Sequence, residues 1–379
     1  MKIVIAPDSY KESLSALAVA TGIEAGFREI FPDAEYVKLP LADGGEGTVE
    51  AMVAATGGKT IEVEVTGPLG EKTRAFFGLS GDEQSAFIEM AAASGLERLP
   101  AERRNPLNTT SYGTGELIRC ALDHGVKHCI IGIGGSATND GGAGMVQALG
   151  ARLLDEQGND IAFGGAALAT LADIDLSGLD ARIGQCKFEV ACDVSNPLTG
   201  ADGASAIFGP QKGATPQMVA ELDRALQHYA QVIERTLGID VERVPGAGAA
   251  GGMGAGLLAF CQAELRQGIE IVTEALGLDA LVRDATLVIT GEGRIDSQSI
   301  NGKVPIGVAR VAKRHNKPVI GIAGSLSTDV DVVHQHGLDA VFSVLYSVCT
   351  LEEALNGAAD NVRMAARNIA ATLRLAQQG

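Results

Sequence analysis

The stretch KIVIAPDSYKESLSA (residues 2–16) decides the fold class of this 379-residue chain. KIVIA (2–6) has the apolar, β-branched composition of a short buried strand. Ser13 or Ser15 can cap a helix after it, and Phe31-Pro32 ends that helix. The chain therefore begins as a strand followed by a helix.

The same alternation continues near both ends of the chain. A second short strand around 36–39 precedes a predicted helix at 47–56. Three further strands, each followed by a helical pattern, are ATLVITGEG (285–293), KPVIGIAGS (317–325) and DAVFSVL (339–345). Alternating strands and helices predict a parallel sheet with helices on its faces.

The middle of the chain has a different pattern. TIEVEVTGPLGEKTRAFFGL (60–79) alternates apolar and polar residues around a Pro-Leu-Gly turn, which predicts a β-hairpin. SAFIEMA (85–91), KHCIIGIGG (127–135) and KFEVACDV (187–194) are further predicted strands, and a long polar helix is predicted over 216–236.

We therefore expect an α/β protein with two α/β domains. Residues 1–63 and 285–379 are predicted to form one Rossmann-like domain, whose parallel sheet takes strands from both chain ends. Residues 64–284 are predicted to form a mixed α/β domain inserted into it.

Composition and charge exclude several classes of function. With 30 Lys and Arg against 47 Asp and Glu, the net charge of −17 repels nucleic acids and anionic membrane surfaces. No stretch approaches the length of a membrane-spanning helix, and the N-terminus has no apolar segment of signal-peptide length. The six cysteines show no CxxC spacing and are expected to be free thiols. These features predict a cytoplasmic protein.

Glycine is enriched, at 49 of 379 residues, and is concentrated in loops that follow the predicted strands. Glycines let backbone N–H groups approach a phosphate, and nearby carboxylates supply the oxygen ligands that Mg²⁺ prefers. Five such loops carry carboxylates: APDS with Asp8, ADGGEGT with Asp43 and Glu46, GIGGSATNDGGAGM with Asp140, ACDVSNP with Asp193, and TGEGRIDSQS with Glu292 and Asp296. Together they predict a polar ligand-binding cleft.

Cations in these loops are few, so each is a candidate ligand for an anion. They are Lys11, Lys212, Arg294 and Lys303. GAGAAG (246–251) matches the dinucleotide motif GxGxxG only literally, because no convincing strand precedes it. Neither a P-loop nor a protein-kinase signature occurs in the chain.

The sequence resembles the bacterial glycerate kinases of the class that acts in glyoxylate and galactarate breakdown. The segments that carry the resemblance span the chain in order: KIVIAPDSYKESLSA (2–16), PLADGGEGTVEAM (40–52), FIEMAAASGL (87–96), IGIGGSATNDGGAGMVQALGA (131–151), ACDVSNPLTG (191–200), IFGPQKGA (207–214), PGAGAAGGMGAG (245–256) and TGEGRIDSQSINGKVPIGVA (290–309).

This resemblance implies ATP-dependent, Mg²⁺-assisted phosphorylation of D-glycerate, with 2-phospho-D-glycerate as the expected product. It also implies a two-domain α/β fold with the active site in the cleft between the two domains. Two alternatives stay open. One is phosphorylation at the 3-hydroxyl, and the other is a nucleotide-linked oxidoreductase acting on glycerate or tartronate semialdehyde. We expect small-molecule partners only, with neither nucleic acid nor membrane, and a homo-oligomer is compatible with the sequence.

We assign roles to the loop residues as hypotheses that follow from this implied reaction. Catalytic candidates are Asp193, Asp296, Lys11 and Arg294, with Asp193 and Asp296 also the candidate Mg²⁺ ligands. Candidates for ATP binding are Gly134, Gly135, Ser136, Asp140, Gly248, Gly251, Gly252 and Gly254. Candidates for substrate binding are Asp8, Asp43, Glu46, Lys212 and Glu292.

Overall fold

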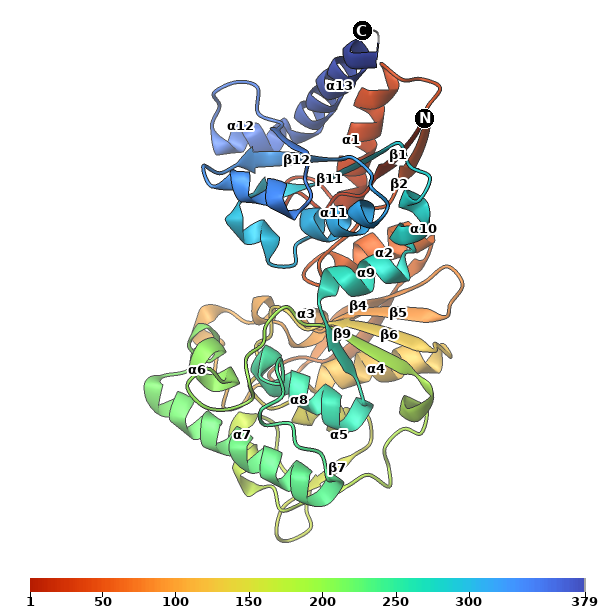
Figure 1. Cartoon of the computed structure of the whole chain (residues 1–379). Helices are drawn as coiled ribbons and strands as arrows, with labels where there is room; N and C mark the ends of the chain where they lie inside the picture. The colour runs from red at the N-terminus through yellow and green to blue at the C-terminus, as the bar shows by residue number, and fades with distance from the viewer. Residues whose placement is uncertain (378–379) are drawn as a thin grey trace. The chain divides into compact units, whose positions relative to one another are not determined.

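The computed structural model describes residues 1–377 and divides into two compact units, each of which is described by itself (Figure 1). Unit 1 consists of residues 1–43, 50–57 and 268–379, and unit 2 of residues 44–49 and 58–267. The two ends of the chain therefore fold together in unit 1.

Unit 1 contains a five-stranded sheet in which all neighbouring strands are parallel. The order across the sheet is β13 (Ala340–Ser343), β12 (Val319–Leu326), β11 (Leu287–Ile295), β1 (Lys2–Ile5) and β2 (Glu35–Lys38). This confirms the predicted α/β class, with a parallel sheet built from N- and C-terminal strands.

Helices cover both faces of this sheet, as parallel sheets require. Ile3 and Ile5 of β1 pack against α1 (Ala16–Arg28) and α13 (Ala358–Gln377), while α11 (Val304–Arg314) packs against β11. Ser15 caps α1, as one of the two alternatives predicted. The remaining helices that lie wholly or partly in unit 1 are α2 (Thr48–Thr56), α9 (Gly268–Ala275), α10 (Leu278–Val282) and α12 (Leu351–Asn356).

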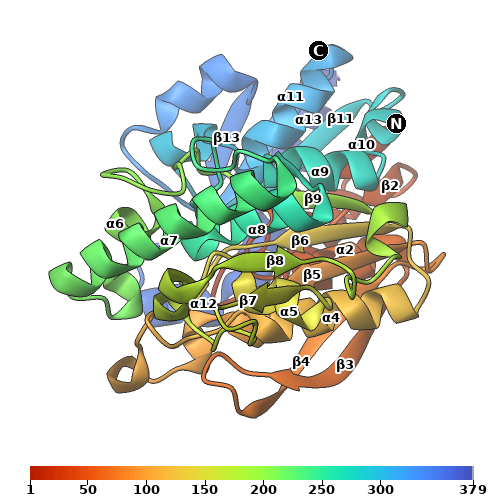
Figure 2. The ribbon, with the colours of Figure 1, turned by 90° about the horizontal axis from the view of Figure 1, so that it is seen from below.

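Unit 2 is built on a six-stranded mixed sheet, whose strands β3 to β6 lie side by side in Figure 2. Its order is β10 (Glu264–Arg266), β9 (Lys187–Ala191), β6 (His128–Gly132), β5 (Ser85–Glu89), β4 (Lys72–Leu79) and β3 (Lys59–Thr66). The β3–β4 and β4–β5 pairs are antiparallel and the others parallel. The hairpin predicted at 60–79 is confirmed.

Helices and a small second sheet complete unit 2. The sheet pairs β7 (Arg152–Leu154) with β8 (Asp173–Asp175) and was not predicted. The helices are α3 (Ala91–Ser94), α4 (Tyr112–Asp123), α5 (Ala143–Ala148), α6 (Ala204–Phe208), α7 (Pro216–Leu237) and α8 (Ala249–Cys261). Thr215 caps α7 with its side chain and Gly238 ends it, close to the predicted bounds of 216–236.

Two further predictions concern cysteines and membranes. All six cysteines are free thiols, as expected. Within residues 1–377, no helix has the length and apolar character needed to cross a membrane.

Candidate active site

The connections of the sheet in unit 1 create a point where the chain changes direction. From β1 the chain moves to β2 on one side, whereas from β11 it moves through β12 to β13 on the other. Ligands of open α/β sheets bind beyond the carboxyl ends of the strands at such a switch point. Here it lies between β1 and β11, where the backbone N–H of Asp8 donates to the carbonyl of Gly291 over 2.8 Å.

At this switch point, the charges of the predicted carboxylates Asp43 and Glu292 act on the carboxylate of Asp8. Burial, together with the charges of Asp43 and Glu292, raises the pKa of Asp8 to about 7, although hydrogen bonds from Ser9 oppose the shift. The Ser9 backbone N–H donates to Asp8 Oδ1 over 2.6 Å. Asp8 can therefore exchange a proton at neutral pH, which is the property a general base needs.

The side chain of Glu292 is buried and contacts two other side chains, which an exposed turn residue would not do. The Glu292 side chain is 8% exposed, accepts a hydrogen bond from the Ser299 hydroxyl and lies 3.5 Å from Lys303 Nζ. Burial raises the pKa of Glu292, while Ser299 and Lys303 lower it. Lys303, predicted only as a candidate anion ligand, thus partly compensates the charge of Glu292.

Arg294 near the end of β11 and Asp296 just after it are more accessible than Glu292. The Arg294 side chain is exposed, and its Nε lies 3.2 Å from Asp296 Oδ2. Asp296 Oδ1 accepts the backbone N–H of Gln298 over 2.9 Å and so caps the short 3-10 helix Ser297–Ile300. The Asp296 carboxylate therefore has a local structural role beside any role toward a ligand.

Lys11 lies in the loop that follows Asp8. Its side chain is exposed, whereas Tyr10 before it is buried and donates its hydroxyl to the Ile322 carbonyl over 2.8 Å. This bond anchors the loop to β12. The loop thus presents an exposed cation from a fixed backbone.

In unit 2, a cavity of about 670 Å³ lies at the carboxyl ends of the parallel strands β5 and β6. The predicted site residues Glu46, Gly134 and Gly135 line it. Residues that were not predicted line it as well: Phe76, Glu89, Ala91, Leu96 and Arg98. The position of Glu89, as the last residue of an apolar strand, is the signal that could have identified it.

The buried side-chain amino group of Lys212 stabilises the loop that follows Gly135. Lys212 is 1% exposed, and its Nζ donates to Ser136 Oγ over 2.7 Å and to the Thr138 carbonyl over 2.6 Å. Burial lowers the pKa of Lys212 to about 7, although Asp140 opposes the shift. Lys212 was predicted to contact substrate, but its side chain lies in the interior and stabilises the loop.

Asp140 stabilises the same loop from within. The carboxylate is fully buried and accepts hydrogen bonds from the Ser111 backbone and hydroxyl, both over 2.8 Å, and from the N–H groups of Gly142 and Gly144. Burial raises the pKa of Asp140, and these donors lower it. All of its described partners are groups of the fold.

The second predicted phosphate-binding segment, 246–256, packs inside unit 2. Gly248, Gly251, Gly252 and Gly254 are buried, and a Cβ on Gly251 would lie 2.0 Å from the Thr138 carbonyl oxygen. Residues 250–252 have positive φ, so regular helix begins only after Gly252. These glycines permit close contact with the loop around 138–142, and burial leaves them no open face for a phosphate.

The segment also lacks the context of a dinucleotide motif. Turns precede residue 249, and no strand leads into GAGAAG (246–251). A Rossmann fingerprint requires strand, turn and helix in succession. The motif that favoured an oxidoreductase is therefore only a coincidence of sequence.

The two candidate metal ligands lie in different units. Asp193 is exposed in the loop after β9 of unit 2, and Asp296 lies in unit 1. Across residues 1–377, no three Asp, Glu, His or Cys side chains are grouped so that they could hold a metal ion. A metal site formed by protein side chains alone is therefore not part of the described structure.

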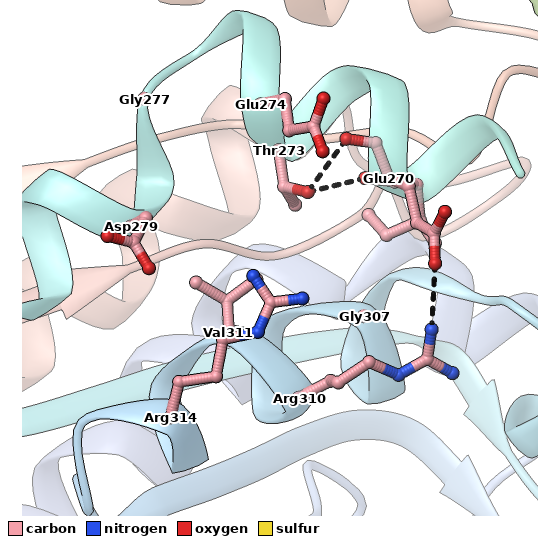
Figure 3. A pocket seen from close by; sticks show the side chains of 10 residues that line it. Glu270, Thr273, Glu274, Gly277, Asp279, Gly307, Arg310, Val311 and Arg314 are labelled. Atoms are coloured by element: carbon pink, nitrogen blue, oxygen red, sulfur yellow. Dashed lines mark hydrogen bonds and ion pairs between the residues drawn. The ribbon is translucent and has the colours of Figure 1, made fainter. Parts of the chain in front are cut away.

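A smaller cavity of about 280 Å³ in unit 1 lies between α9, α10 and α11 (Figure 3). Arg310 on α11 pairs with Glu270 on α9 over 3.1 Å, and Asp279 pairs with His315 over 2.9 Å. Since these charges compensate each other and no glycine-rich loop lines the cavity, we assign no ligand to it.

Carboxylates with a few cations at a switch point, and a cavity bordered by glycine-rich loops, are the parts of an enzyme that binds small anionic substrates and transfers phosphoryl groups. The chain belongs to the glycerate kinase family, since the profile of the "Glycerate kinase family" matches residues 3–374.

Individual relatives are similar to this chain over all or nearly all of their lengths. The chain is 70% identical to the glycerate 2-kinase of Escherichia coli K12, covering 99% of this chain and 98% of the relative. It is 60% identical to the glycerate kinase of Bacillus subtilis 168, covering 100% and 99%. The crystal structure of a homologue from Salmonella typhimurium LT2 matches with a TM-score of 0.94 and 72% identity, covering 100% of both chains.

Proposed function

We propose that this chain transfers the γ-phosphoryl group of ATP to the 2-hydroxyl of D-glycerate, giving 2-phospho-D-glycerate. The observation that carries the proposal is the 70% identity, over 99% of the chain, to a protein named glycerate 2-kinase. At this identity and coverage the residues of the switch point and of the cavity are expected to serve the same chemistry in both proteins.

Asp8 is the residue that we propose as general base. A hydroxyl becomes a better nucleophile when a positioned carboxylate takes its proton, and a base with a pKa near 7 does so efficiently at neutral pH. The raised pKa of Asp8 and its position at the switch point both support this role. Lys11 follows Asp8 by three residues and Arg294 follows Glu292 by two, and both side chains are exposed and carry the charge that the glycerate carboxylate requires.

The proposed donor is ATP with Mg²⁺. Bound Mg²⁺ would neutralise the phosphate charge that develops during transfer. It commonly takes one or two protein carboxylates and fills the remaining positions with phosphates and water. Asp193 in unit 2 and Asp296 in unit 1 are each a carboxylate of the kind that such an Mg²⁺ takes, and each is a separate candidate ligand. The absence of any larger ligand group among residues 1–377 argues against a preformed protein cage.

A coupled assay of ADP release tests the proposal. Purified protein with D-glycerate, ATP and Mg²⁺ should release ADP in proportion to the glycerate consumed, and omission of glycerate should remove most of the signal. Excess EDTA should abolish turnover, and added Mg²⁺ should restore it.

The same preparation also tests the alternative of an oxidoreductase. With NAD(H) or NADP(H) and glycerate or tartronate semialdehyde, absorbance at 340 nm should stay constant. A change at 340 nm without ADP release from ATP would contradict the kinase proposal.

We further propose that the protein works in the cytoplasm on small molecules. The six free thiols support a reducing compartment. The net charge of −17 disfavours nucleic acids and anionic membranes as partners. Gel filtration of the purified chain would show whether it works as a homo-oligomer.

A further inference from the structure

The cavity of unit 2 is much larger than glycerate needs. Its volume of about 670 Å³ falls in the range of pockets that enclose cofactors and drug-sized ligands, about 300–1,000 Å³. Glycerate has only three carbon atoms and would leave most of this space filled with water. The size of the cavity therefore favours ATP over glycerate as its ligand.

The walls of the cavity are suited to an aromatic ring. Phe76 of β4 is half-buried and packs against the core of unit 2, and Ala91, Ala92 and Leu96 add further apolar surface. Flat heterocycles gain binding energy from stacking on an aromatic side chain and from burial against small apolar residues. A carboxylate such as glycerate gains nothing from these surfaces.

The charged residues that line the cavity suit the uncharged adenosine part of a nucleotide better than a small anion such as glycerate. Glu46, Glu89 and Glu97 line it, whereas Arg98 is the one cation among its lining residues. Glu89 Oε1 accepts the backbone N–H of Val49 over 2.8 Å and so has a fixed position. Carboxylates fixed in a pocket accept hydrogen bonds from ribose hydroxyls and from the exocyclic amine of adenine.

One part of the rim can approach phosphates. Gly134 and Gly135 are exposed, and a Cβ built on Gly134 would meet no atom within 4 Å. The backbone of this turn is therefore open to the cavity. Its place after a parallel strand is the usual one for a loop that contacts phosphate.

We infer that this cavity binds the adenosine part of ATP, with the base against Phe76 and Leu96, the ribose toward the glutamates, and the phosphates at the Gly134–Gly135 turn. The inference rests on the proposed function, since it names the place of the nucleotide in that reaction.

Binding of ADP, measured by calorimetry with Mg²⁺ and without glycerate, tests this assignment independently of turnover. Ala91→Phe fills the cavity beside Gly135, and we expect it to weaken ADP binding by about tenfold or more. The matched control is Ala365→Phe, because Ala365 is also half-buried on a helix and lines a cavity of about 200 Å³ in unit 1. The control should bind ADP like the wild type.

A second variant keeps the test decisive if Ala91→Phe fails to fold. Phe76→Leu retains apolar volume but removes the aromatic face, and it should weaken ADP binding severalfold and raise the KM for ATP, with the KM for glycerate unchanged. Wild-type ADP affinity in a folded Ala91→Phe variant, or in Phe76→Leu, would overturn the inference while leaving glycerate kinase activity intact. Conversely, ADP binding that depends on this cavity in a protein without glycerate kinase activity would support the inference and refute the proposed function.

Discussion

At the scale of single residues, Asp8 shows how the fold changes the chemistry of a side chain. The sequence predicted Asp8, Asp43 and Glu292 as neighbours, because each follows or ends a strand of a parallel sheet. It could not predict that burial and the other two charges raise the pKa of Asp8 to about 7, since burial depends on residues far away in the chain. A group predicted to bind substrate thus became the candidate base.

The replacement Asp8→Asn tests this role through activity and stability. The folded-state pKa of Asp8, about 7, lies above the ordinary value of 3.8, so the native state binds the proton more tightly than the unfolded state. The contribution of Asp8 to stability is therefore fully present below about pH 4 and is lost as the pH rises toward 7. We expect the variant to be more stable than the wild type at pH 8, with little advantage at pH 4, and its kcat to fall about 10²-fold or more.

Denaturant unfolding at the two pH values and kinetics at saturating substrates measure both effects. The wild-type profile of kcat/KM should fall as the pH decreases through about 7. If Asp8→Asn kept near-normal kcat, or if it were less stable than the wild type at pH 8, the role assigned to Asp8 would be wrong.

Lys212 is a residue whose role could not be predicted from its neighbours in sequence. Its segment, IFGPQKGA (207–214), is rich in glycine and polar residues and suggested an exposed loop. The structure instead buries the ammonium group against Ser136 and the Thr138 carbonyl. Such burial is a property of packing between distant segments, which no local pattern encodes.

We expect Lys212→Met to destabilise the fold by about 1–3 kcal/mol, because the Thr138 carbonyl loses a buried donor. The folded-state pKa of Lys212 is lowered from 10.5 to about 7, so the unfolded state binds more protons between these values. The stability due to Lys212 therefore rises with pH over this window. Urea unfolding at pH 7 and pH 9 should show a wild-type advantage that grows with pH, and an advantage independent of pH would contradict the assignment.

At the scale of elements, the strands and long helices were largely predictable and the special backbone conformations were not. The hairpin at 60–79 and helix α7 follow from alternation and capping residues, which are local signals. The positive φ values of residues 250–252 accompany close contact with the loop around 138–142, and no local sequence pattern predicts them. Likewise, the glycine-rich segments 132–142 and 246–256 differ in burial. Gly134 and Gly135 are exposed in the first, whereas the candidate phosphate-binding glycines of the second are buried.

Gly134→Ala tests the open loop without disturbing the fold. The added methyl group meets no atom within 4 Å, and φ of Gly134 lies outside the left-handed region, so stability should change by less than about 1 kcal/mol. The methyl group should nevertheless keep phosphates from the backbone and raise the KM for ATP about tenfold. Gly184→Ala is the matched control, because Gly184 in unit 2 is also exposed and unobstructed.

Steady-state kinetics with ATP varied, together with thermal melts, compare the two variants. An unchanged KM for ATP in Gly134→Ala would refute contact between this turn and the nucleotide.

At the scale of the whole molecule, the sequence was sufficient to predict the fold class and the family. The alternation of strands and helices at both ends predicted one parallel sheet made from distant segments, and the structure contains it. The β7–β8 sheet was missed because its strands have three residues each, too few for a periodic signal. The sequence was a poorer guide to which loops can contact a ligand. Whether a loop is exposed or buried depends on packing between distant segments, which is set only when the chain folds.

The position of the phosphate on the product tests the central claim most directly. Purified protein should convert D-glycerate, ATP and Mg²⁺ to an ester whose proton-coupled ³¹P NMR signal is a doublet, because the secondary carbon of 2-phosphoglycerate carries a single proton. A triplet, from the two protons on the primary carbon of 3-phosphoglycerate, would contradict the assignment of the 2-hydroxyl as acceptor, and the absence of any glycerate ester would contradict the kinase activity itself.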